Sequence, residues 1–173
     1  MENWIDLYTE ISEKIRDSIP EVVWIDLWHN QVNFLADEHP FRTPAVFLNF
    51  RSLGTTDLGE KLQQVNLQVD FFLFYETFAD TYNGAFNQDS ALEFLKVMEK
   101  IHGNFHGTAG DNYSAMRRIG FNAEDTGGAG NLYKVTFGCL LEDSSAAKYY
   151  NESAEINFEL LRDEEDDGYV IPG

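Results

Sequence analysis

Apolar residues near the start of the chain recur every three or four positions, which is the period of an amphipathic helix. The polar residues between them would form the solvent-facing side. Pro20 disfavours the helical conformation in the residue before it and so marks an end. We therefore predict a helix over residues 3–18, with its apolar positions at Trp4, Ile5, Tyr8, Ile11, Ile15 and Ile19.

Alternation of apolar and polar residues predicts three strands after this helix, at residues 21–28, 45–51 and 64–75. Residues 29–43 have no steady period and contain a proline, which indicates a long loop. Residues 52–60 are rich in glycine and threonine, and we predict a flexible loop there that is suited to form a protruding hairpin tip. One face of the longest strand carries Val65, Leu67, Val69, Phe71 and Leu73.

A second helix is predicted to begin at Ser90, because Glu93 three positions later completes a capping box. Gly103 is expected to end it. Two final strands, residues 116–124 and 132–142, are joined by a glycine-rich run that is typical of a hairpin turn. The buried stripe of the helix is predicted to be Leu92, Leu95, Met98, Ile101 and Phe105. One face of the last strand carries Tyr133, Val135, Phe137, Cys139 and Leu141.

The order helix, three strands, helix, two-strand hairpin predicts an α+β fold, with one mixed or antiparallel sheet and helices packed on one face. We expect the longest strand to pack against the second helix, since each needs the other to cover an apolar face. That packing would bury Leu95, and its truncation to alanine should then cost about 2–5 kcal/mol. The core domain is predicted to span residues 1–143.

Residues 144–173 differ in character and are predicted to form an acidic carboxyl-terminal arm. They hold eight acids against Lys148 and Arg162, and five of those acids are consecutive at residues 163–167. Ile156, Phe158 and Leu160 alternate within this segment. We expect them to be the contacts of an arm that orders against a neighbour, with disorder of the last residues as the alternative.

The charge balance excludes ordinary nucleic-acid binding, because 30 acids stand against 12 lysines and arginines and give a net charge of -18. Such a surface repels a phosphate backbone. The acids either keep the protein soluble or line a surface past which DNA slides without adhering. A single cysteine excludes an internal disulfide and fits a reducing cytoplasm. We expect neither a signal peptide nor a membrane span, since the chain has no suitable apolar run.

Several sequence motifs suggest catalysis or metal binding but lack essential parts. His102 and His106 have the spacing of metal ligands on a helix, but the motif lacks its glutamate and Gly103 is expected to interrupt the helix. Residues 125–127 read Asp-Thr-Gly, as in aspartic proteases, yet they lie in a glycine-rich turn. Cys139 lies in the middle of a strand and is expected to be a buried packing thiol. We predict no catalytic, cofactor or metal site.

The layout resembles the tail terminator (tail-completion) proteins of long-tailed bacteriophages. The resemblance covers residues 2–143 and is one of pattern and order. It depends on the first helix, the closing hairpin, and the segments VVWIDLW, PAVFLNF, VNLQVDFFLFYE and SALEFLKVMEKIHG. Proteins of that family form rings, commonly hexamers, which cap the tail tube and join it to the head around the channel for DNA.

The resemblance implies a structural virion protein, not an enzyme, made in the cytoplasm of a host bacterium. Its partners would be copies of itself and the tail tube and neck proteins, with DNA passing through without specific binding and no membrane or cofactor involved. Asp57 and Glu60 are then candidates for a channel or interface loop. Two alternatives remain: another neck or tail component, or a small cytoplasmic α+β enzyme or ligand-binding domain whose site is assembled from distant residues.

Overall fold

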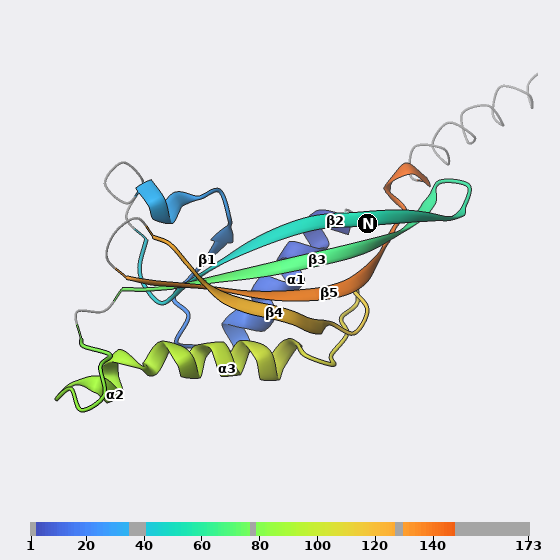
Figure 1. Cartoon of the computed structure of the whole chain (residues 1–173). Helices are drawn as coiled ribbons and strands as arrows, with labels where there is room; N and C mark the ends of the chain where they lie inside the picture. Colours follow the sequence, from blue (N-terminus) through green and yellow to red (C-terminus); the bar gives the residue numbers. More distant parts are fainter. Residues whose placement is uncertain (1–2, 35–40, 77–78, 127–129, 148–173) are drawn as a thin grey trace, which may run out of the picture.

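The structure, a computed structural model, describes residues 3–34, 41–76, 79–126 and 130–147. Five strands form one mixed sheet in the order β1-β2-β3-β5-β4 (Figure 1). Their bounds are β1 (Trp24–Leu27), β2 (Ala45–Gly59), β3 (Leu62–Tyr75), β4 (Arg117–Glu124) and β5 (Asn131–Asp143). Only β1 and β2 pair in parallel, and the other neighbours are antiparallel. The α+β class and the mixed sheet predicted from the sequence are confirmed.

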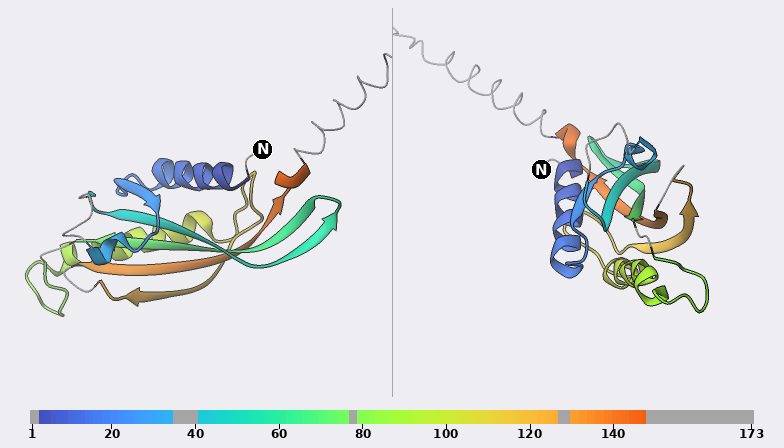
Figure 2. Two further views of the ribbon diagram at one scale, coloured as in Figure 1. Left: turned by 90° about the horizontal axis from the view of Figure 1, so that it is seen from above. Right: turned by 90° about the vertical axis from the view of Figure 1, so that its left-hand side faces the viewer.

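Two longer helices, α1 (Asn3–Ser18) and α3 (Glu93–Phe105), lie on the same face of this sheet (Figures 1 and 2). The structure adds a short 3-10 helix, η1 (Gln31–Phe34), and a one-turn helix, α2 (Gln88–Ala91), that the pattern did not predict. The main core lies between the long helices and the sheet. Both predicted strand faces lie in it, Val65 to Leu73 on β3 and Tyr133 to Leu141 on β5.

Helix α1 has the predicted bounds, but its first turn lies outside the core. Trp4 is 40% and Ile5 61% exposed, so their assignment to the buried stripe was wrong. Burial starts one turn later, because the first turn of the helix reaches the margin of the sheet, where the Trp4 ring lies 6.5 Å from that of Phe50. The helix residues buried completely are Leu7, Ile11 and Ile15, followed by Ile19 after the helix end.

Helix α3 is rotated relative to the prediction. Its N-cap is Leu92, with no side-chain cap bond, so the predicted capping box at Ser90 is wrong. Leu95 is 38% exposed, and the helix passes through Gly103. The helix ends before Gly107, whose φ of 75° suits the left-handed position that follows a helix. The buried stripe consists of Phe94, Val97, Ile101 and Phe105, with Met98 partly buried against it.

The region predicted as a loop at residues 52–60 is largely strand. β2 continues to Gly59, and the chain reverses at Glu60 and Lys61, where Lys61 has a φ of 65°. The β2–β3 register shifts twice, which leaves Leu53 and Leu58 as extra residues of two bulges. The predicted loop was wrong. This stretch is exposed on both faces of the sheet, so its sequence lacks the apolar alternation by which a strand is recognised.

A smaller cluster of aromatic residues covers the opposite face at one end of the sheet. Trp28 stacks on Phe72, with ring centroids 4.1 Å apart and planes at 8°. The backbone N–H of Trp28, the residue directly after β1, donates to the Leu48 carbonyl at 2.9 Å. The strand β1 itself is shorter than the predicted strand at residues 21–28. The cluster is formed by Val32, Ala45, Phe47, Phe72, Phe74 and Leu132, with Trp24, Trp28 and Phe41 beside it.

A carboxylate is buried beside this cluster, on the face opposite α1 and α3. Asp70 is 4% exposed, and its oxygens accept hydrogen bonds from neutral groups of three strands. Thr136 Oγ1 donates at 2.7 Å, Gln68 Nε2 at 3.1 Å and Asn49 Nδ2 at 3.4 Å. These donors stabilise the buried charge and connect β2, β3 and β5 on this face.

Candidate assembly surface

Three strands project beyond the helices as a long arm (Figures 1 and 2). We call this part the sheet extension: residues 51–66 of β2, β3 and their turn, with residues 140–143 of β5. The two outer strands stop short of it, because β1 pairs only as far as Leu48 and β4 begins opposite Gly138. All ten residues from 51 to 60 are exposed. The extension therefore presents side chains on both faces and an edge of β2 that no described strand covers.

The side chains of the sheet extension are mainly polar, with the exposed Leu53, Leu58 and Leu140 among them. Leu53 and Leu58 are each 49% exposed at the two bulges. Asp57 and Glu60, the predicted channel or interface residues, are both exposed near the hairpin tip. Gln63 Nε2 donates to the Asp57 carboxylate at 2.9 Å across the hairpin. Both acids therefore lie exposed near the outer end of the arm.

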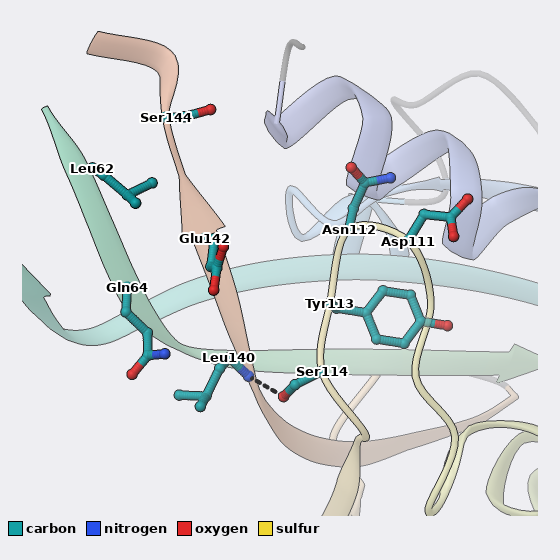
Figure 3. A pocket seen from close by; sticks show the side chains of 9 residues that line it. All are labelled: Leu62, Gln64, Asp111, Asn112, Tyr113, Ser114, Leu140, Glu142 and Ser144. Carbon is teal, nitrogen blue, oxygen red and sulfur yellow. Dashed lines mark hydrogen bonds between the residues drawn. The ribbon is translucent and has the colours of Figure 1, made fainter. Parts of the chain in front are cut away.

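A groove of about 500 Å³ lies at the base of the extension, between β5 and the loop of residues 111–114 (Figure 3). Strand and loop meet where Ser114 accepts a hydrogen bond at its Oγ from the Leu140 N–H, at 2.8 Å. The groove is lined by Leu62, Gln64, Asp111, Asn112, Tyr113, Ser114, Leu140, Glu142 and Ser144.

Helix α1 holds this loop in place through hydrogen bonds. The Glu10 carboxylate accepts hydrogen bonds from the Asp111 N–H at 2.7 Å and from the Asn112 N–H at 3.0 Å. Lys14 Nζ donates to the Tyr113 hydroxyl at 3.3 Å. Burial, with the Glu10 charge second, raises the pKa of Tyr113 to about 12, so this hydroxyl stays protonated at neutral pH. Side-chain hydrogen bonds therefore tie the groove wall to helix α1.

The candidate chemistry of the sequence lies elsewhere. His102 and His106 are close, with ring centroids 4.8 Å apart, because α3 continues through Gly103 where an interruption was expected. The His106 Nδ1 atom accepts a hydrogen bond from the Arg118 N–H at 3.1 Å. Burial, then the charges of Arg118 and His106, lower the pKa of His102. Within the described residues, no three His, Cys, Asp or Glu side chains form a group that could hold a metal ion.

The other flagged residues are also separate. Cys139 is 6% exposed in the main core, as predicted for a packing thiol, and burial raises its pKa to about 11. Asp125 is exposed and Thr126 is buried after the end of β4, and the glycine that follows them lies outside the described residues. The predicted arm contacts Ile156, Phe158 and Leu160 lie outside them too, so the arm from residue 144 stays a prediction.

One surface that the sequence analysis missed is the outer edge of β4. Arg117, Arg118, Ile119 and Phe121 are all exposed along this strand. Alternation signals a strand but does not tell which strand lies last in the sheet, and that position depends on pairing with β5. The run of two arginines in so acidic a chain was the one available signal.

No protein-family model matches the sequence, and no curated protein matches it either. In the part of the chain that the structure describes, no helix is both long enough and apolar enough to cross a membrane.

Proposed function

We propose that this protein is a structural virion subunit of the tail terminator type, which forms a ring that caps a tail tube and joins it to the head. The observation that carries the proposal is the sheet extension, a three-stranded arm that projects beyond the helices. Within this arm only Val65 and Leu141, at its base, belong to the main core, and residues 51–60 are exposed and available for contacts with other chains.

The exposed backbone of β2 supports this use. Beyond Leu48, β2 has β3 on one side and no described strand on the other. An unpaired strand edge is a ready template for pairing with another chain, and proteins protect such edges unless they use them. Leu53 and Leu58 add apolar contact area at the same place. A repeated head-to-tail contact between one surface and a different surface closes into a ring when the rotation allows it.

The charge of the hairpin tip suits the channel of such a ring. Asp57 and Glu60 are both exposed near the tip, and the chain has a net charge of -18. Acids in a lumen would repel the DNA backbone and keep DNA from adhering during passage. The partners are further copies of the chain, the tail tube and the neck proteins, and the site of action is the virion, reached from the host cytoplasm.

The test is the mass of the purified chain by size-exclusion chromatography with light scattering, followed by electron microscopy of negatively stained particles. We expect a closed ring of about six times the 19.8 kDa chain, alone or on added tail tubes. Leu53→Asp with Leu58→Asp should give a folded monomer. The control is Phe86→Asp, an exposed aromatic residue outside the extension, which should leave the ring intact. A compact monomer at every concentration, with or without tubes, would contradict the proposal.

A further inference from the structure

The edge of β4 is open for part of its length. Its start is covered, because the Arg118 N–H donates to His106 and the Gly107 N–H donates to the Met116 carbonyl at 2.7 Å. From Ile119 to Glu124, no described strand lies beyond β4. The Asn122 side chain donates to the Ala123 carbonyl at 3.3 Å within this stretch. A further strand of about six residues therefore has a backbone template here.

The side chains along this edge combine apolar surface with unneutralised positive charge. Ile119 is 59% and Phe121 57% exposed. The Arg118 guanidinium lies over the Phe121 ring at 5.8 Å. Neither Arg117 nor Arg118 forms an ion pair with a described residue. A hollow of about 510 Å³ opens beside the two arginines, between Ile119 and Leu140. This edge suits an extended segment that is apolar first and acidic afterwards.

We propose that the acidic arm of a neighbouring copy binds here as an added antiparallel strand. This inference rests on the proposed ring. The arm carries Ile156, Phe158 and Leu160 in alternation and then five acids at residues 163–167. When Leu160 lies beside Phe121, antiparallel pairing along the open edge ends with Arg162 beside Ile119. Asp163 then follows at the covered start of the strand, beside the exposed Arg118. The acidic run then continues past Arg117, where opposite charges meet.

The position at which β5 ends favours binding of the arm to a neighbouring copy over binding to its own subunit. β5 ends at Asp143, at the far end of the sheet extension, whereas β4 begins opposite Gly138 (Figure 1). The loop of residues 111–114 lies between them along the β5 edge, joined to it where the Ser114 N–H donates to the Leu140 carbonyl at 2.9 Å. A returning arm would have to pass around this loop, and an arm that leaves the extension would reach the next subunit of a ring without that detour.

Disulfide trapping in the full-length chain tests the pairing. Directly opposite residues of antiparallel strands have Cα atoms about 4.5–5.5 Å apart, within the range of about 4.4–6.8 Å that a disulfide spans. We expect the Phe121→Cys, Leu160→Cys double variant to give a ladder of covalent multimers on oxidation. The native Cys139 is buried and does not compete. The matched control combines Leu160→Cys with Phe86→Cys, an exposed position outside the sheet extension, and should give no ladder.

Charge reversal is the second part of the test. In the double-cysteine chain, Arg117→Glu with Arg118→Glu should lower the yield of multimers about tenfold, since two attractions become repulsions. Asp163→Arg with Glu164→Arg should restore it. A disulfide formed only within one chain would overturn the inference. A ring-sized particle without cross-links would also overturn it, but would still support the proposed ring. A chain that stays monomeric and unlinked contradicts both proposals.

Discussion

Truncating Ile101 to alanine tests the packing of α3 on the sheet. Ile101 is 0% exposed in the main core, on the stripe that faces β3 and β5. The change removes three carbon groups, which at about 0.8 kcal/mol each amounts to roughly 2.4 kcal/mol of lost transfer free energy. The cavity left behind raises the expected loss of unfolding free energy to about 3–4 kcal/mol.

The matched control is Leu95→Ala, on the same helix. Leu95 is 38% exposed, and its truncation should cost about 1 kcal/mol or less. The free energy of unfolding is measured by urea denaturation, and an unchanged slope for both variants shows that their midpoints can be compared. In a thermal melt, a loss of 3–4 kcal/mol should lower the Tm by about 6–16 °C. An equal loss for both variants, or a larger one for Leu95→Ala, would refute the observed rotation of α3.

Three further predictions follow from polar groups. Asp70→Asn places an amide against hydrogen-bond donors and should cost about 1–3 kcal/mol of unfolding free energy in the same urea assay, with an unchanged midpoint as the contrary result. Burial raises the pKa of Cys139 from 9.0 to about 11 and that of Tyr113 from 10.0 to about 12, so the unfolded chain loses these protons first. The free energy of unfolding should therefore be constant below pH 9 and fall between pH 9 and 12. The fall should be less steep in Cys139→Ala, which lacks one of the two groups. An equally steep fall in that variant would contradict the role of Cys139. The double change Asp57→Lys, Glu60→Lys should alter the free energy of unfolding by about 0.5 kcal/mol or less. It should slow DNA ejection from virions, and added salt should reduce this defect because it screens the charges. Normal ejection would show that neither acid lines the channel.

The sequence predicted the elements that bury one regular face. In β3, Val65, Leu67 and Val69 alternate with polar residues, and this period of two identifies both the strand and its buried side. The same holds for Val135 and Phe137 in β5. Here local pattern and tertiary packing favour the same structure, so the prediction from the pattern was correct.

The phase of α3 could not be predicted in this way. Leu92, Leu95 and Met98 have helical spacing, and so do Phe94 and Val97, and both series continue to Ile101. The pattern alone does not separate the two stripes. The sheet beneath decides between them, and it takes the stripe with Phe94, whose ring stacks 5.1 Å from that of Tyr133 on β5.

The candidate surfaces were harder still to predict. Residues 51–60 are exposed on both faces of a strand, and such a strand has no apolar face for a periodic pattern to report. The groove joins Ser114 to Leu140, two residues that only the pairing of distant segments brings together. Asp57 and Glu60 were chosen from the charge excess and the resemblance, within a predicted loop that is largely strand, and their role in a channel or interface stays a prediction.

The missing helical cover over the sheet extension also divides the subunit by local stability. The helix-backed half of the sheet holds its strands with a packed core, whereas residues 51–60 at the outer end of the extension are all exposed and depend mainly on backbone hydrogen bonds that water can reach. Amide protons near Thr55 and Gln64 should therefore exchange through small local openings, and those of Val69 and Phe137 only through unfolding of the whole domain. A subunit built this way can adjust its arm to the surface it meets while its core keeps its shape.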